Sequence, residues 1–494
     1  MLGEGQETAG AGTYVLASWL FLRLLGLIYL VAFVSLATQL KGLVGKHGIL
    51  PAREFLQERR HWGPSRFLRM PTLCWLSASD TFMLWLAWSG AALALLLLAG
   101  FAPIPVLVLL WVSYLSLATV CRIFLGYQWD ILLLEAGFLG ILLAPLEVAP
   151  RFPPVATPSP IVVWLFWWLL FRLMFSSGVA KLRSGDPTWR NLTALSHHYE
   201  TQPLPTPLAW QAHQLPVGFH KISTVVMFAI EILAPFLIIA PSPARFVAAA
   251  LFILLMALIQ ITGNYCFFNL LGIALSILLL DDKVLAPVVG WAFPQLESPG
   301  AFIPAPNWLN GAVTVVAVSI LTLSAERILH LFRVRINLPN WLAELLGLLE
   351  PFRLVNSYGL FSVMTAERPE IVVEGSNDAV NWQPYEFKFK PGEVTRAPAF
   401  VAPHQPRLDW QLWFAALGYY QNNPWFSRFL ARLLEGSPTV LSLLKINPFP
   451  GSPPRYVRAV LYDYRFTNRA ARRATGAWWQ RERRGFYSPI LELP

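Results

Sequence analysis

Long uninterrupted apolar runs constrain this fold more than any other feature of the sequence. The first run, from Tyr14 to Ala37, is more than twenty residues long, which is enough for a helix to cross a roughly 30 Å hydrocarbon core. It lacks a small-residue cleavage site, and residues 1–13 contain no Lys or Arg, so it is read as a spanning helix and not as a removed signal peptide. With 55% hydrophobic and 13% charged residues, the chain is predicted to be an integral membrane protein.

The distribution of these runs predicts a polytopic α-helical membrane domain of about eight or nine spans over residues 1–335. The runs lie at 14–38, 80–101, 104–122, 128–147, 160–181, 222–240, 245–262 and 308–329, with a shorter one at 265–281. "GFAPIP" and "APSPAR" predict tight helical hairpins, because Pro and Gly end one helix just before the next begins. Function is expected in the long connections, 39–79 and 182–221, because long loops on a rigid scaffold commonly carry it.

A different pattern begins near Glu350. "EIVVEGSNDAVNWQPYEFKFKPGE" alternates β-branched and aromatic residues with charges, and "RYVRAVLYDYRFT" places Tyr462, Tyr464 and Phe466 on one face. Such alternation is typical of half-buried antiparallel strands. Residues 350–494 are therefore predicted to form a water-facing, mostly β domain with a helical insertion near 424–445.

The charge distribution bears on partners and on orientation. The net charge of +10 suggests contact with acidic lipid head groups and not with nucleic acid, since no aromatic-and-basic binding motif accompanies it. Residues 39–79 hold seven Lys or Arg, and residues 181–221 hold four. The positive-inside rule then places both loops, and the C-terminal domain with them, in the cytoplasm.

Two carboxylates lie inside one apolar run. "YQWDILLLEAGFLGILLAP" carries Asp130 and Glu135, and an acidic group within the bilayer is a functional hypothesis by default because its burial is costly. Asp130 lies near the end of the run and is expected to reach water, and the spacing puts the two carboxylates on different helix faces. We expect Glu135 to form a structural pair with Arg122, Arg172 or Lys181, with a catalytic or proton-relay role as the alternative.

The segment that leaves the membrane after residue 181 contains several candidate interface residues. We expect Lys181 and Arg183 to extend toward the interface and Trp189 to act as an interfacial anchor. "NLT" makes Asn191 a glycosylation acceptor if this loop faces a secretory lumen.

The stretch "ALSHHYETQPLPTP", residues 194–207, is the most distinctive loop. Its prolines predict a stiff, extended segment that the His and Tyr side chains hold by hydrogen bonds. His197 and His198 are adjacent and point apart, so a shared metal ion is not expected. The loop is predicted to be structural or to bind a partner through His197, His198, Tyr199 and Glu200. General acid–base chemistry by a histidine with Glu200 is the alternative.

Recognised catalytic and metal motifs are absent from the sequence. It has no Gly-rich phosphate loop and no G-x-S-x-G nucleophile elbow, and Cys74, Cys121 and Cys266 are too far apart for a disulfide framework or a zinc pattern. No cofactor and no metal are predicted. The enzyme hypothesis is weakened without being excluded.

Long ordered segments resemble the lipase maturation factor family over nearly the whole chain. They include "YLVAFVSLATQLKGLVGKHGILPAREFL", "SHHYETQPLPTPLAW", "VNSYGLFSVMTAERPEIVVEGS", "RLDWQLWFAALG" and "INPFPGSPPRYVRAVLYDYRFT". The helical part is also distantly similar to the membrane domain of vitamin-K-dependent carboxylases. "EGSNDAVNW" looks like a motif of discoidin-type jelly rolls, which usually has Gly at the position of Ala379.

The resemblance implies a membrane protein that helps secreted lipases to fold and assemble. It implies an endoplasmic-reticulum membrane for a eukaryotic chain and the cytoplasmic membrane for a bacterial one. It also implies that the C-terminal domain faces the lumen, opposite to the side that the charge pattern predicts.

Two functional hypotheses follow. In the first, the chain is a maturation factor whose C-terminal domain and proline-rich loop bind a client, a lipase or related secreted protein, in contact with membrane lipids. Arg407, Asp409, Trp410 and Trp413 of "RLDWQLWF" are the additional candidate binding residues, since Arg and aromatic residues are enriched at interfaces; a place in the domain core is the alternative for the two Trp. In the second, an intramembrane enzyme on a carboxylase-like scaffold acts on a lipid, quinone or peptide. Its catalytic candidates are Glu135, Lys181, His197 and His198.

Overall fold

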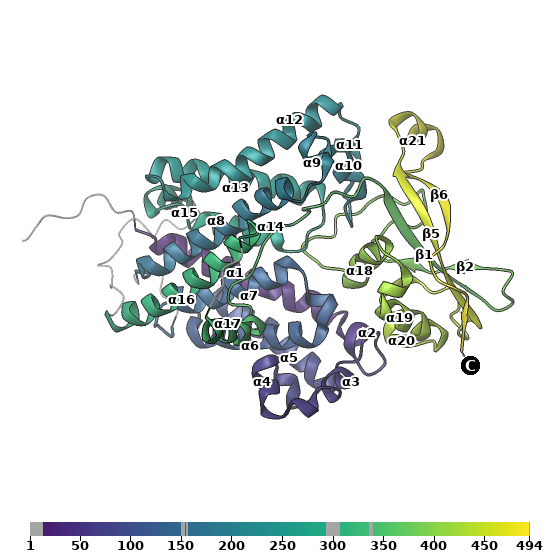
Figure 1. Ribbon diagram of the computed structural model, residues 1–494, viewed down its shortest axis with the longest axis horizontal. Helices are drawn as coiled ribbons and strands as arrows, with labels where there is room; N and C mark the ends of the chain where they lie inside the picture. The colour runs from purple at the N-terminus through teal and green to yellow at the C-terminus, as the bar shows by residue number, and fades with distance from the viewer. Residues whose placement is uncertain (1–12, 150–153, 155–156, 293–306, 335–338, 494) are drawn as a thin grey trace, which may run out of the picture.

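The apolar runs fold into a bundle of helices, and a sheet-containing C-terminal domain lies at one end of this bundle (Figure 1). The computed structural model describes residues 13–149, 154, 157–292, 307–334 and 339–493. The helices of the bundle are α1 (Val15–Ala37), α5 (Asp80–Ala99), α6 (Pro103–Cys121), α7 (Gln128–Leu143), α8 (Pro160–Arg183), α12 (Val217–Phe228), α13 (Ser242–Thr262), α14 (Phe268–Ile277), α15 (Asp282–Ala292), α16 (Asn307–Leu331) and α17 (Asn340–Leu349).

Seven helical stretches in the described part of the chain are long and apolar enough to cross a membrane. They are Val15–Ala37, Asp80–Ala99, Pro103–Leu125, Pro160–Arg183, Val217–Ile239, Ser242–Thr262 and Val313–Leu331. The predicted runs at 128–147 and 265–281 form helices that are not among these seven, because α7 has 16 residues and α14 has 10. At its rise per residue α7 is only about 24 Å long, and Ala144, held extended before Pro145, ends it. The predicted count of eight or nine spans is therefore not confirmed.

The two predicted hairpins are present. Gly100 ends α5 in the left-handed conformation with φ 92°, and α6 begins at Pro103. A left-handed residue just past a helix end favours glycine because a side chain there is strained. In the second hairpin, Pro241 adopts the extended conformation immediately before α13.

Helix α12 does not continue as a regular α-helix across the bundle. It passes into a π-helical turn, η4 (Ala229–Leu233), and then into a 3₁₀ segment, η5 (Ala234–Ile239). Gly178 of α8 faces this turn so closely that a Cβ atom there would lie 2.5 Å from Ile232 Cγ1. The π turn is therefore accommodated by the absence of a side chain on the neighbouring helix.

Both long loops form short helices that contact the C-terminal domain. Residues 39–79 contain α2 (Leu40–Val44), α3 (Ala52–Gln57), η1 (Arg60–Ser65), α4 (Arg66–Arg69) and η2 (Leu73–Trp75), and the later loop contains α9 (Pro187–Arg190), α10 (Ala194–Thr201) and α11 (Pro207–His213). Ser437 Oγ donates to the His47 carbonyl at 2.8 Å, and Trp210 Nε1 donates to the Thr467 carbonyl at 2.9 Å. The two loops and the C-terminal domain thus lie on the same side of the bundle.

The C-terminal domain contains an antiparallel sheet in the order β2-β1-β5-β6, with β7 also paired to β5. Its strands are β1 (Arg368–Ser376), β2 (Gln383–Pro384), β5 (Tyr456–Phe466), β6 (Trp479–Phe486) and β7 (Leu491–Glu492), and β3 (Glu386–Phe387) pairs with β4 (Leu444–Ile446) in a separate ribbon. As predicted, Tyr464 and Phe466 share a buried face of β5, where they pack with Trp479 and with Trp210 of the membrane domain.

Helices lie between this sheet and the bundle (Figure 1). They are α18 (Arg407–Ala416), η8 (Tyr420–Asn422), α19 (Pro424–Leu434) and α20 (Pro438–Leu441), while α21 (Arg469–Thr475) connects β5 to β6. Two of them, α19 and α20, lie within the predicted insertion at 424–445. The jelly-roll likeness is not confirmed. The predicted strand through Phe389 ends at β3, because the amides of Phe389 and Lys390 donate instead to Asp409.

A segment without regular secondary structure, residues 354–366, links the bundle to β1. It is hereafter the connecting segment. It is preceded by η7 (Glu350–Phe352) and runs along α7 and α8, with Val355 and Tyr358 buried. Backbone that is not helical needs polar partners wherever it is shielded from water, and side chains of the membrane domain supply them.

Candidate functional site

The predicted extended loop at 194–207 is mostly helical. Residues Ala194–Thr201 form α10, and α11 starts at Pro207, the first helical position at which a missing N–H costs nothing. Thr206 caps α11 by accepting the Ala209 amide at 3.2 Å. Only the intervening residues are extended, where Pro205 forms a β-bridge with Gly263. The expectation of an extended segment is therefore correct for residues 202–206, but it was wrong for residues 194–201, which form α10, and for Pro207, which begins α11.

A chain of hydrogen bonds orients His198. Tyr265 Oη donates to Gln202 Oε1 at 2.7 Å, and Gln202 Nε2 donates to the Thr262 carbonyl, which fixes the amide orientation. Tyr265 Oη, 3.3 Å from His198 Nε2, then accepts from that nitrogen. This assignment leaves His198 Nδ1 as an acceptor. Burial, together with the charge of Lys181, lowers the pKa of His198 to about 4, so the imidazole is neutral at pH 7.

The neighbours of His198 have different surroundings. Glu200 accepts the Phe466 amide of β5 and lies 3.7 Å from His213 Nε2, and burial raises its pKa despite these contacts. Tyr199 lines the same cavity as His198, whereas His197 is half-buried outside it. Client binding by residues 197–200 stays a prediction.

Lys181 also lines the cavity that contains His198. It does not reach the interface as expected, because its Nζ lies 2.7 Å from both carboxylate oxygens of Glu231 on the π turn. Trp189 is likewise no interfacial anchor, since it is 2% exposed and its Nε1 donates to the Phe361 carbonyl at 3.1 Å. Polar partners inside the protein hold both side chains in place of lipid head groups.

Glu135 lies outside that cavity and holds the connecting segment. It pairs with Arg172, one of the three predicted partners. Its second oxygen accepts from the Asn356 amide at 3.0 Å and from Tyr358 Oη at 2.7 Å. This buried carboxylate is therefore used to satisfy non-helical backbone and its flanking side chains. The catalytic candidates Glu135, Lys181 and His198 do not converge on one site.

Asp130 does not reach water as expected. It is 0% exposed and forms a two-pronged ion pair with Arg407 of α18, with both N to O distances at 3.0 Å. Tyr114 Oη donates to the same carboxylate at 2.5 Å. Parallel hydrogen bonds from a guanidinium to a carboxylate are among the strongest in proteins. This pair joins the C-terminal domain to the bundle.

The other candidates on α18 are also buried. Asp409 accepts the amides of Phe389 and Lys390, both at 2.8 Å. Trp413 Nε1 donates to the Thr201 carbonyl at 2.9 Å, and the Trp410 ring lies 4.9 Å from that of Trp129. Burial of this kind favours the domain core, the alternative considered for the two Trp, and client binding by these residues stays a prediction.

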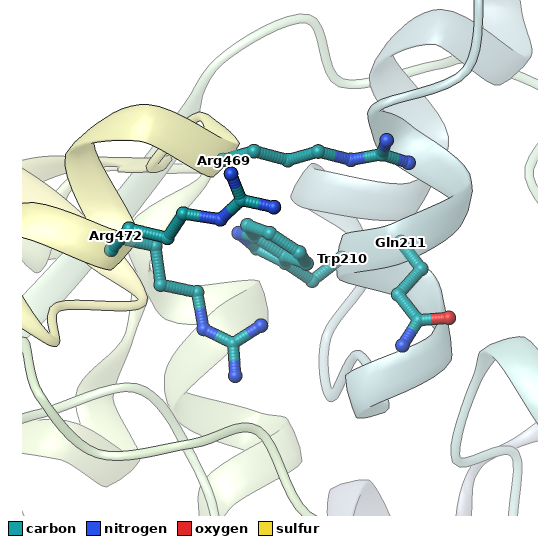
Figure 2. Close-up of a pocket in the computed structure, with 5 residues that line it drawn as sticks. Trp210, Gln211, Arg469 and Arg472 are labelled. Carbon is teal, nitrogen blue, oxygen red and sulfur yellow. The ribbon is translucent and has the colours of Figure 1, made fainter.

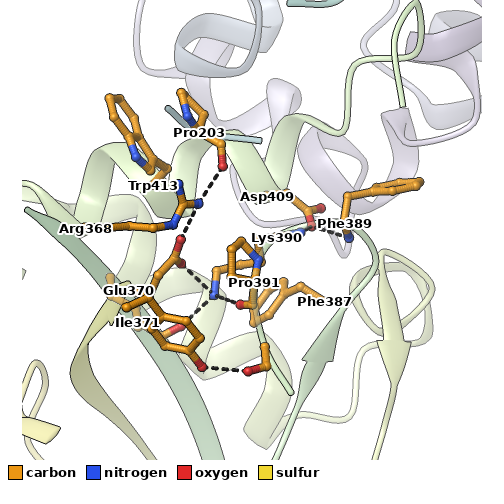
Figure 3. A network of polar contacts seen from close by, with 12 residues as sticks. Pro203, Arg368, Glu370, Ile371, Phe387, Phe389, Lys390, Pro391, Asp409 and Trp413 are labelled. Atoms are coloured by element: carbon orange, nitrogen blue, oxygen red, sulfur yellow. Dashed lines mark hydrogen bonds and ion pairs between the residues drawn. The ribbon is translucent and has the colours of Figure 1, made fainter. Parts of the chain in front are cut away.

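A network around Arg368 fixes the proline-rich segment to the sheet (Figure 3). The guanidinium, 1% exposed, donates to the backbone carbonyls of Glu200, Gln202 and Pro203. It also pairs with Glu370 at 2.7 Å, and Glu370 pairs with Lys390 at 2.9 Å. Sequence reasoning missed this cluster. Its signal is the pair of opposite charges two residues apart in the apolar strand "RPEIVVEGS".

A basic pocket lies between α11 and α21 (Figure 2). It has a volume of about 500 Å³ and is lined by Trp210, Gln211, Arg469, Arg472 and Arg473. Arg472 lies over the rings of Trp210 and Trp478, 4.5 and 3.4 Å from their centroids. Arg469 and Arg473 are exposed. The pocket could bind an acidic group, because it combines free cationic surface with an aromatic wall.

Cys74, Cys121 and Cys266 are free thiols in the interior. Across the described residues, no group of three or more His, Cys, Asp or Glu side chains could hold a metal ion. Asn191 is exposed at the end of α9.

The fold and these sites define a polytopic membrane protein whose C-terminal domain is docked against the helical bundle by the buried ion pair of Arg407 with Asp130 and by hydrogen bonds from Arg368 to the second loop. A family model described as lipase maturation factor transmembrane domain matches residues 16–287, and one described as lipase maturation factor C-terminal domain matches residues 354–489. The chain belongs to the lipase maturation factor family.

Curated relatives match over most of their length. "Lipase maturation factor 2" of Gallus gallus is 38% identical over 96% of this chain and 81% of the relative. The Homo sapiens protein of the same name is 37% identical, over 96% and 82%. "Lipase maturation factor 1" of Bos taurus is 36% identical, over 99% and 92%. No solved structure matches the chain.

Proposed function

We propose that this chain is a membrane-bound maturation factor that helps lipases to fold and assemble. The names of its relatives support the client class. The structural observation that carries the proposal is the buried attachment of the C-terminal domain through Asp130 to Arg407 and through the Arg368 network. Such an attachment holds the domain at a fixed position beside the membrane, where it can present one surface to a client during assembly.

The buried candidate residues act as scaffold in this proposal. Arg407, Asp409, Trp410 and Trp413 are each less than 10% exposed, so they contribute to client handling by positioning the domain. Glu200 acts in the same way through the Phe466 amide. A client would therefore bind the exposed surface of the C-terminal domain.

The exposed Arg face around α21 and β6 is the proposed client surface. It includes Arg469 and Arg473 of the basic pocket and Arg481 and Arg483 of the edge strand β6. Charges along an edge strand discourage unselective strand pairing, and a basic face steers an acidic partner toward it. We expect a client with a complementary acidic patch.

The test is production of active lipase in cells whose own maturation factor has been deleted. The chain is expressed with a secreted lipase, and lipase activity is measured per mass of secreted lipase. The double variant Arg469→Gln, Arg473→Gln is expected to weaken client binding by roughly tenfold, if each exposed charge contributes about 0.7 kcal/mol. The double variant Arg53→Gln, Arg60→Gln removes the same charge from exposed positions of the first loop and should behave as wild type.

Failure of the unmodified chain to raise the specific activity of any secreted lipase contradicts the proposed function. Equal losses in the two double variants contradict the proposed surface and leave the function standing, because a general charge effect then explains both.

The intramembrane enzyme remains the second candidate, favoured by the presence of Lys181 and His198 in one cavity. Glu135 is engaged elsewhere and Lys181 is held by Glu231. Of these three, His198 alone retains a nitrogen with an available lone pair. Evidence that His198 transfers a proton to or from a substrate would support the enzyme hypothesis. Evidence that the cavity binds no substrate would contradict it.

We propose that the C-terminal domain and both long loops face the secretory side of the membrane. The resemblance to the family supports this side, against the excess of Lys and Arg in the loops, and the positive-inside rule is a statistical tendency. Asn191 is exposed in the second loop and is then available for glycosylation in a eukaryotic cell.

A further inference from the structure

The cavity beside His198 has the form of a binding site for a lipid-like molecule. Its volume is about 430 Å³, within the roughly 300 to 1,000 Å³ of small-molecule sites. Most of its wall is apolar and includes Met174, Val226, Ile230, Leu255, Met256 and Ile259. A wall of this composition suits a hydrocarbon tail.

The cavity opens onto an exposed apolar surface of the bundle. Three of its lining residues, Ile222, Val226 and Leu258, are 67%, 51% and 49% exposed. They lie on α12, the first part of the stretch Val217–Ile239, and on α13, and both stretches are long and apolar enough to cross a membrane. A molecule dissolved in the bilayer therefore has a route into the cavity without passing through water.

The charged groups that line the cavity are Lys181 and Glu231. Their side chains are 7% and 8% exposed, and Lys181 Nζ donates to both oxygens of Glu231 at 2.7 Å. An ammonium group has three N–H donors. The third has no acceptor within hydrogen-bond distance among the described residues, so it is free for a ligand oxygen.

The net charge of this pair is zero, which restricts the ligand. An anionic head group next to Lys181 would also meet the Glu231 carboxylate, and a cationic one next to Glu231 would meet Lys181. A buried charge without its own partner is strongly unfavourable. An uncharged head group avoids this cost.

His198 adds the complementary hydrogen-bonding group. Its Nε2 is engaged by Tyr265, and its Nδ1 is left as an acceptor. A hydroxyl can both accept from Lys181 and donate to His198 through a single oxygen, whereas a carbonyl or a quinone oxygen only accepts. A hydroxylated head group therefore matches both residues.

Local backbone geometry positions this ion pair. Glu231 belongs to the π turn, and Gly178 of α8 leaves the space that brings this turn against Lys181. Single π turns inside α-helices frequently occur at functional sites. We propose that the cavity binds an uncharged single-chain amphiphile with a hydroxylated head, of the monoacylglycerol class, with its tail between α12 and α13 and its head between Lys181 and His198. This binding goes beyond the proposed maturation of a client and does not depend on it.

The test is direct binding of radiolabelled 1-oleoylglycerol to the purified full-length protein in mild detergent, in competition with unlabelled 1-oleoylglycerol, oleate or oleoyl lysophosphatidylcholine. We expect saturable binding of one molecule per chain. Oleate and the lysophospholipid share the tail but carry charged heads, so they should compete at least tenfold more weakly. Equal or stronger competition by oleate overturns the assignment of the head group, and absence of saturable binding overturns the site.

Two variants locate the bound molecule. Ser223→Phe fills the cavity from α12, and Ser319→Phe adds the same ring to an exposed position of α16. At least a tenfold loss in the first with no change in the second supports the site. Equal binding by both variants places the ligand elsewhere and overturns it.

The head group is tested by removing both charges together. The double variant Lys181→Met, Glu231→Met avoids leaving one buried charge unpaired. If its elution profile matches wild type, it should retain the tail site but bind 1-oleoylglycerol roughly tenfold more weakly, because the head group loses its donor on Lys181, while oleate stays a weak competitor. Unchanged affinity for 1-oleoylglycerol overturns the role of the ion pair. Should the double variant not fold, the exchanged variant Lys181→Glu, Glu231→Lys is measured instead; its net charge is also zero, so it should keep the preference for the uncharged head, and a preference for oleate overturns the role of the ion pair.

Discussion

Two ion pairs of equal length show at the residue scale how burial decides what a pair contributes. Arg407 with Asp130 and Arg428 with Glu54 both have N to O distances of 3.0 Å. The first pair is 0% exposed, whereas the side chains of the second are 51% and 52% exposed. Water and salt screen the exposed pair, which contributes about 0–1 kcal/mol. Removing one partner of the buried pair is strongly destabilising, because the other charge then remains unpaired inside the protein.

Arg407→Met is therefore expected to lower the free energy of unfolding by about 3–5 kcal/mol, and Arg428→Met by at most about 1 kcal/mol. Unfolding is measured by titration with sodium dodecyl sulfate in mixed micelles. Adding Asp130→Leu to Arg407→Met should restore most of the stability, since the unpaired carboxylate is removed. Equal effects of the two single variants would contradict the role given to burial.

The sequence predicted the ion-pair partner of Glu135 but not that of Asp130, because the two pairs differ in their separation along the chain. Glu135 was assigned three candidate partners because all three lie in or beside neighbouring apolar runs, and Arg172 is one of them. Arg407 is 277 residues from Asp130 and lies in a segment predicted to face water. No periodicity or spacing links two groups so far apart, so the pair appears only once the domains are docked.

At the scale of elements, the π turn of η4 depends on a missing side chain. The seven stretches long and apolar enough to span were each predicted, because length and apolarity are properties of the segment itself, although the predicted count of eight or nine is not confirmed. The π turn was not predicted, since it requires Gly178 on α8 to face Ile232 on another helix. The same limit applies to α10, whose helical form is held by contacts of its C-terminal end with Arg368.

Gly178→Ala is expected to displace the π turn, because its Cβ would lie 2.5 Å from Ile232 Cγ1 and 3.0 Å from Glu231 Cβ. We expect a loss of about 1–3 kcal/mol in the free energy of unfolding, typical of overpacking, together with weaker binding in the cavity. The matched control is Gly311→Ala on α16, where a Cβ would have nothing within 4 Å; it should be neutral or stabilising by up to about 1 kcal/mol. If the unfolding midpoint of Gly178→Ala equals that of the wild type, the prediction is contradicted, because the π turn then adjusts to the added methyl group.

At the scale of the whole molecule, the C-terminal domain uses the bundle as part of its own interior. The Trp410 ring lies 5.9 Å from that of Tyr265, Trp210 of α11 joins the core of Tyr464, Phe466 and Trp479, and Arg368 binds carbonyls of the second loop. The alternation of polar and apolar residues after Glu350 predicted a separate water-facing domain. That pattern describes the strands correctly but does not reveal that α18 and β5 are covered by another part of the chain.

A fragment of residues 366–494 expressed alone is therefore expected to be unstable. It would expose the apolar surface around Trp410 and leave Arg407 without its carboxylate. We expect aggregation in size-exclusion chromatography, or a broad thermal transition where the full-length protein shows a sharp loss of structure. A soluble monomer with a single sharp transition would contradict the dependence of this domain on the bundle.

The pairing of Asp130 with Arg407 also affects the order in which the protein can fold while it is being synthesised. At about 5–20 residues per second, the ribosome adds the 277 residues that separate them in roughly 14–55 s. Throughout this interval α7 is already synthesised while the guanidinium that neutralises Asp130 does not yet exist. The membrane part of this protein thus cannot reach its final arrangement helix by helix as it is made, because its last step waits until the segment that contains Arg407 has been synthesised.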